Sequence, residues 1–131
     1  MYFVFGNEVL DSAELAKNIE EGTKLRLVCD LTKSTKREDT GAFLFRLSAN
    51  EICCEDINEM AYEDKVDALM KKADEYSNEA LKMLPEQARY KIFSFRYDEV
   101  ENDIEIILVM AHLELGEKKL FDVLNRMLKQ I

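Results

Sequence analysis

The chain has 131 residues, of which 47% are hydrophobic and 34% are charged, and its formal net charge at pH 7 is −9. This length and composition predict one ordered globular domain spanning residues 1–131, and they exclude a disordered or low-complexity protein. Because the acid surplus repels nucleic acid and anionic membranes, we expect direct binding to neither.

A strand and a helix are expected first. The segment YFVF alternates apolar residues before a Gly6-Asn7 turn, which predicts a strand and, with the following EVL, a small hairpin. Asp11 and Glu14 have the spacing of a capping box, and Leu10 and Leu15 occupy the two positions of a hydrophobic staple. They predict a helix that ends at Gly22 in a left-handed conformation.

Three strands are expected after this helix. The segment KLRLVCDL has the period-two pattern of a half-buried strand, with one side formed by Leu25, Leu27, Cys29 and Leu31. AFLFRL alternates in the same way, and EICC follows a plausible turn at residues 48–50. The three segments predict a meander.

The polar stretch LTKSTKREDTG connects the first two of these strands and is longer than the usual hairpin loop. One interpretation is a solvated linker in which Glu38 and Asp39 neutralise the neighbouring cations. The other is a contact loop in which Lys33, Lys36 and Arg37 hold a phosphate or a partner's carboxylates. In that case hydroxyl groups are expected to contribute further donors, from Ser34, Thr35 and Thr40.

The second half predicts two helices around a hairpin. Asp56 and Glu59 have capping-box spacing, and helix formers continue to the single proline. The segments RYKIFSFRYDEV and DIEIILVMAHLEL predict a long antiparallel hairpin whose second strand, apolar on both faces, is central and covered. After Gly116 an amphipathic helix is expected, with a buried stripe of Leu120, Leu124, Met127 and Ile131 supported by Phe121 and Leu128.

The predicted order is β-α-β-β-β-α-β-β-α, an α+β fold with a mainly antiparallel sheet of about five to six strands packed by three helices. Three of the strands carry a Phe-x-Phe pair, and residues two apart share one face of a strand. We therefore expect an aromatic layer in the core rather than a ligand platform. The pairs are Phe3 and Phe5, Phe43 and Phe45, and Phe93 and Phe95.

Few residues indicate catalysis. His112 is the only histidine and lies in the apolar strand of the hairpin, so a hydrogen-bonded core residue is the first interpretation and a proton-transfer or ligand role the alternative. Cys29, Cys53 and Cys54 lack chelating spacing, and no phosphate-binding or calcium-binding loop is present, so we predict no metal site and no cofactor. The odd cysteine number and the absence of a signal-like start favour the cytoplasm.

Acidic residues are concentrated in two segments. Residues 51–75 hold nine acids against three lysines, and residues 98–105 hold five acids and no base. Each segment is either a solvated surface or a surface that faces a basic partner. The candidate partner-binding residues are Glu55, Asp56, Glu59, Glu63, Asp64, Asp67, Asp98, Glu99, Glu101 and Asp103.

These patterns favour a non-enzymatic binding protein that recognises a basic protein partner. Inhibitors, immunity proteins and chaperones belong to this class, and their carboxylates can stand in for the phosphates of nucleic acid. The alternative is a small enzyme or ligand-binding domain, with a pocket between sheet and helices that involves His112 or the loop from Lys33 to Arg37. A homodimer is also compatible with the sequence, through a sheet edge or through Leu120, Phe121 and Leu128 of the last helix.

From Asp11 onward, the predicted element order is similar to that of small acidic type III secretion chaperones. The resemblance covers most of the chain and lies in order and charge. It implies that the protein binds a partner protein. The N-terminal strand and the long second helix depart from the chaperone pattern.

Overall fold

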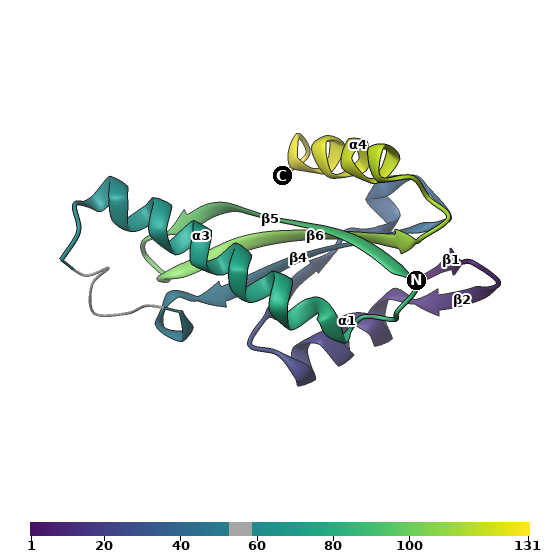
Figure 1. Ribbon diagram of the computed structural model, residues 1–131, viewed down its shortest axis with the longest axis horizontal. Helices are drawn as coiled ribbons and strands as arrows, with labels where there is room; N and C mark the ends of the chain where they lie inside the picture. Colours follow the sequence, from purple (N-terminus) through teal and green to yellow (C-terminus); the bar gives the residue numbers. More distant parts are fainter. Residues whose placement is uncertain (53–58) are drawn as a thin grey trace.

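The computed structural model describes residues 1–52 and 59–131. These residues form a two-stranded and a four-stranded antiparallel sheet with three α-helices (Figure 1), which confirms the predicted α+β class. The elements are β1 (Tyr2–Phe5), β2 (Glu8–Asp11), α1 (Ser12–Gly22), β3 (Arg26–Asp30), β4 (Thr40–Ser48), α3 (Tyr62–Ala80), β5 (Ala88–Asp98), β6 (Asp103–His112) and α4 (Glu117–Leu128). Short 3-10 helices are η1 (Thr32–Thr35), η2 (Ala49–Glu51) and η3 (Leu81–Met83).

The four-stranded sheet has the order β3-β4-β6-β5, with every neighbouring pair antiparallel. Strand β6 is buried at each residue from Asp103 to Ala111, as its apolar residues on both faces predict. Helices α1 and α3 cover one face of the sheet and α4 covers part of the other (Figure 1). The core therefore has two layers, separated by the sheet.

The first helix begins as the sequence predicts and ends differently. Asp11 is the N-cap of α1, and its carboxylate accepts a hydrogen bond from the backbone N–H of Ala13 at 3.1 Å. The predicted left-handed ending at Gly22 is wrong, because Gly22 is the last helical residue and the next residue, Thr23, is extended. The Thr23 hydroxyl donates to the carbonyl of Ile19 at 2.7 Å and so satisfies the last turn.

The predicted meander is wrong in its third strand. Glu51 lies in η2 and Ile52 follows in a turn, whereas Cys53 and Cys54 of the predicted EICC strand lie outside the described residues. The Ser48 hydroxyl accepts from the N–H of Asn50 at 3.3 Å and favours this 3-10 turn. Strand β4 pairs with β6 instead, and the additional strand is β2, in the N-terminal hairpin.

A β-bulge interrupts the alternation of β3. The register with β4 shifts between Leu27 and Cys29, and both Val28 and Cys29 are exposed. The prediction that Cys29 shares a side with Leu25 and Leu27 fails for this reason, since an inserted residue reverses the faces of those that follow it.

The aromatic layer contains two of the three predicted pairs. Those from β1 and β4 are fully buried in the core that α1 and α3 cover, namely Phe3, Phe5, Phe43 and Phe45. Phe95 packs instead against the core layer under α4. Phe93 lies on the edge strand β5, where it pairs with Ile107 of β6, and is 44% exposed.

Both edge strands of the four-stranded sheet donate a backbone N–H to a helix carboxylate. On β3, Leu27 donates to Glu20 of α1 at 3.2 Å. On β5, Ser94 donates to Asp74 of α3 at 2.8 Å. These acceptors occupy positions at which a further strand would bind.

The buried side of α4 consists of Leu120, Val123, Leu124 and Met127. Ile131, predicted in the buried stripe, is 45% exposed, and Phe121, predicted to support it, is 51% exposed. Of the residues considered for a homodimer, Leu120 lies in the core, Leu128 is half-buried against it, and Phe121 is open to solvent.

Candidate functional site

The structure brings the two predicted acidic segments to one end of the molecule. The start of α3 and the turn between β5 and β6 lie together at the left of Figure 1. The hydroxyl of Tyr62 donates to the carboxylate of Glu99 at 3.3 Å and so links the two segments. Exposed carboxylates gather there, and we call this group the acidic end: Glu59, Glu63, Asp64, Asp67, Glu99 and Glu101. The candidates Glu55 and Asp56 lie outside the described residues.

Two further candidate acids bind arginines of the protein itself. Asp103 is 6% exposed, and its carboxylate lies 2.8 Å from Arg26 and 3.6 Å from Arg46. Asp98 lies 3.3 Å from Arg46. The N–H of Glu101 donates to Asp98, and this bond together with the arginine lowers the pKa of the Asp98 carboxyl. Both acids thus connect the β5–β6 hairpin to β3 or β4 and are less accessible than the acidic end.

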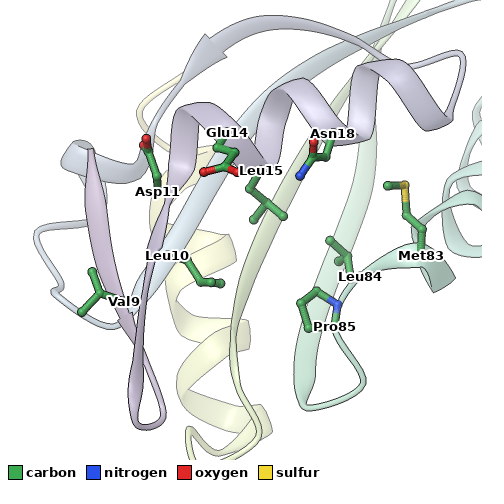
Figure 2. Close-up of a pocket in the computed structure, with 9 residues that line it drawn as sticks. All are labelled: Val9, Leu10, Asp11, Glu14, Leu15, Asn18, Met83, Leu84 and Pro85. Carbon is green, nitrogen blue, oxygen red and sulfur yellow. The ribbon is translucent and has the colours of Figure 1, made fainter.

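A groove of about 370 Å³ lies between β2, α1 and η3, at the other end of the molecule (Figures 1 and 2). Its apolar surface comes from the hairpin, from α1 and from the segment that ends at the proline. Three polar residues, the N-cap of α1 and two residues of the helix itself, form its rim and recur at helical spacing. The lining residues are Val9, Leu10, Leu15, Met83, Leu84 and Pro85, with Asp11, Glu14 and Asn18 on the rim.

The rim of this groove is acidic. Glu14 is exposed, its side chain forms no hydrogen bond or ion pair with another described residue, and its carboxylate lies on the groove side of α1 beside Leu15 (Figure 2). Asp11 is the helix cap and also lies 3.4 Å from the amino group of Met1. Glu14 therefore completes no capping box and is the open carboxylate of the rim.

The groove was not predicted from the sequence, which assigned two of its residues another role. Leu10 and Leu15 were expected to form a staple, and both are half-buried where they line it. Met83 comes from a segment 68 residues further along than Leu15, and its thioether lies against Gly22, where an added Cβ would be 3.2 Å from the sulfur. No local pattern indicates which distant segment closes a groove.

The predicted contact loop is anchored to the fold. Thr35 is buried, its hydroxyl donates to the carbonyl of Thr32 at 2.8 Å, and its own carbonyl accepts from Arg126 of α4 at 2.6 Å. Arg37 forms a bidentate pair with Asp39, at 2.9 and 3.1 Å, and this pair lowers the pKa of the Asp39 carboxyl. The loop is therefore held to α4 at Thr35, and Asp39 neutralises Arg37 as the linker interpretation expects, whereas contact with a partner stays a prediction.

Two lysines of the loop have open side chains. Lys33 and Lys36 are exposed and form no ion pair with another described residue, and Lys36 has a left-handed backbone (φ 57°). With Arg37 they line a hollow of about 380 Å³ against the outer face of the hairpin, where Tyr2 and Val4 are exposed.

His112 is the last residue of β6 and is half-buried against the N-terminal hairpin. Its ring packs edge-on against Phe5 with centroids 5.1 Å apart, and its Nδ1 accepts from the N–H of Glu114 at 3.1 Å. Gly6 approaches it so closely that an added Cβ would lie 2.8 Å from the ring. His112 and Arg37 line one surface hollow of about 350 Å³.

Within residues 1–52 and 59–131, no three potential ligands of the His, Cys, Asp and Glu types come together as a metal site would require. Cys29 is a free, exposed thiol. In the same ranges, no helix combines the length and apolarity needed to cross a membrane.

No protein-family model matches the chain, and comparison with curated proteins and with solved structures finds no match. The resemblance to secretion chaperones is thus one of element order. The predicted order placed three strands between the first and second long helices. The described residues between α1 and α3 form two strands, so the element order matches the chaperone order less well than predicted.

Proposed function

We propose that the protein is a non-enzymatic binding protein that recognises a basic protein partner in the cytoplasm, as inhibitors, immunity proteins and chaperones do. The observation that carries the proposal is the acidic end, where two segments some forty residues apart in sequence gather their exposed carboxylates. A net charge of −9 adds a long-range attraction for the same class of partner.

The carboxylates of the acidic end are available for a partner. Arginines bind Asp98 and Asp103, whereas Glu63, Asp64 and Asp67 are exposed on the first turns of α3 and form no ion pair with a described residue. Clustered carboxylates of this kind increase association rates with cationic surfaces and bind their lysines and arginines directly. The partner's cationic surface is one that otherwise contacts phosphates.

The test is a pull-down from the source organism's lysate, at low and at high salt, with bound proteins identified by mass spectrometry. A variant of the acidic end replaces Glu59, Glu63, Asp64 and Asp67 by Gln or Asn. A matched control neutralises four other exposed acids in the same way, at Glu8, Glu21, Glu86 and Asp122. Removing four negative charges from −9 leaves both variants at −5, so they differ in the place of the charge and not in its amount.

We expect one basic partner in stoichiometric amount that the wild type and the control retain at low salt, that the acidic-end variant loses, and that high salt releases. Equal loss in both variants would mean that total charge, and not the acidic end, attracts the partner. Empty beads at both salt concentrations contradict the proposal.

A second candidate function has one observation in its favour. His112 and Arg37, the two features considered for a ligand-binding domain or small enzyme, line the same hollow. In this case native mass spectrometry of the purified protein should detect a bound small molecule that a His112→Gln variant loses while its melting temperature is unchanged. A lowered melting temperature with retained partner binding supports a structural role for the histidine.

A further inference from the structure

The groove between β2, α1 and η3 combines open apolar surface with one sign of charge. Val9 and Met83 lie at opposite sides of its lining (Figure 2) and are 62% and 45% exposed, whereas Leu84 is nearly buried. Apolar side chains exposed at the walls of a concave surface are typical of a place where another molecule binds.

We propose that this groove receives an apolar side chain from a cationic segment of the protein partner. The proposal rests on the proposed function above and adds a second contact, at the end of the molecule opposite the acidic end. The occupant is a stretch of the partner in which a large apolar residue is adjacent to lysine or arginine.

The charges around the groove select this occupant. Neither lysine nor arginine lines the groove, and the rim carries Asp11, Glu14 and the amide of Asn18. The carboxylate of Asp11 already has a cationic partner, because the Met1 amino group lies 3.4 Å from it. The carboxylate of Glu14 is open. An ammonium or guanidinium beside the bound apolar group can form an ion pair with Glu14. An anion there is repelled by the rim carboxylates and by the net negative charge of the chain.

The size of the groove also fits a side chain. Its volume of about 370 Å³ is near the lower limit of small-molecule pockets, enough for one or two large apolar side chains. The floor is preformed, because Leu10 and Leu15 already pack against the core formed by α1 and α3. Binding therefore requires little ordering of this chain.

Three probes with the same ring and different charge test the chemistry: benzylamine, benzyl alcohol and benzoate. Each is titrated into the full chain at neutral pH and followed by backbone amide NMR shifts. We expect shifts at Leu10, Leu15 and Leu84, with the amine binding about fivefold more tightly than the alcohol and the benzoate most weakly, a ratio that one or two exposed ion pairs produce.

Matched variants separate charge from shape. Glu14→Gln keeps the volume of the rim and should remove most of the preference for the amine, with the affinity for the alcohol unchanged. Glu21→Gln changes the same helix outside the groove lining and should leave the preference intact. Equal affinity for the three probes, or shifts outside the groove alone, overturns the proposal.

The pull-down distinguishes this proposal from the proposed function. A variant with Val9→Thr and Met83→Gln removes apolar surface without adding charge, and it should lose the partner while it keeps the far-ultraviolet circular dichroism of the wild type, because both side chains are exposed. If this variant retains the partner and the acidic-end variant loses it, the groove proposal is wrong and the proposed function stands. If the wild type binds no partner, the proposed function fails, and the probe titration still measures the groove.

Discussion

The close approach of Gly6 and His112 gives a stability prediction that also tests the structural role of the histidine. Gly6 has φ 61° and is the first central residue of the turn between β1 and β2, a position that favours glycine. A Cβ added there would lie 2.8 Å from two ring atoms of His112. The ring cannot turn away freely, because it packs on Phe5 and accepts a hydrogen bond from Glu114.

The cost of Gly6→Ala follows from these two effects. An L-residue in the left-handed conformation costs about 1–2 kcal/mol, and forcing a methyl group into a packed contact costs about 1–3 kcal/mol. We therefore expect a loss of about 2–5 kcal/mol in the free energy of unfolding. Gly116→Ala is the control, since no atom lies within 4 Å of its added Cβ and its φ is −65°, and it should change stability by less than about 1 kcal/mol.

Urea unfolding followed by circular dichroism measures both variants, and a double-mutant cycle with His112→Ala separates the two effects. Removing the ring abolishes the clash, so Gly6→Ala in that background should cost only the backbone part. The reasoning is refuted if Gly6→Ala costs less than about 1 kcal/mol, or if the two substitutions are additive within about 0.5 kcal/mol.

Three further predictions concern the cap, an ion pair and the aromatic layer. Asp11→Ala should lower stability by about 1 kcal/mol and Asp11→Asn by a few tenths, measured by urea unfolding, because asparagine also caps a helix. Arg37 lowers the pKa of Asp39, so this pair stabilises the fold above the unfolded aspartate pKa, and the stabilisation is lost as pH falls through the folded pKa. Arg37→Met should raise the Asp39 pKa in a carboxyl NMR titration. It should also reduce the change of unfolding free energy with pH in that acidic range. Phe45→Ala should cost about 3–5 kcal/mol, whereas Phe93→Ala, at 44% exposure, should cost less than about 1 kcal/mol by the same urea assay.

Local patterns predicted most elements and the start of the first helix. The cap at Asp11, the turn at Gly6-Asn7 and the central position of β6 each depend on neighbouring residues, and each is present in the structure. These features are determined by hydrogen bonds within a turn or by apolar residues within one strand, which a sequence displays directly.

What could not be predicted depends on distant contacts. The edge position of β5 leaves Phe93 at the surface, although its spacing is that of the buried Phe43 and Phe45. Pairing of β4 with β6 rather than with the segment that follows it is equally invisible in local alternation. For the candidate site, sequence reasoning located the acidic segments, but it gave no indication that Arg46 neutralises Asp98.

The carboxylates of Glu20 and Asp74, at the two edges of the four-stranded sheet, affect how the protein can associate with other molecules at high concentration. A strand from another molecule that approaches β3 or β5 must displace Glu20 from the N–H of Leu27, or Asp74 from that of Ser94. Each displacement also brings the incoming backbone against a negatively charged side chain. Edge-to-edge addition of a strand is thereby opposed at both edges of the sheet, so we expect these two acidic side chains to act against aggregation.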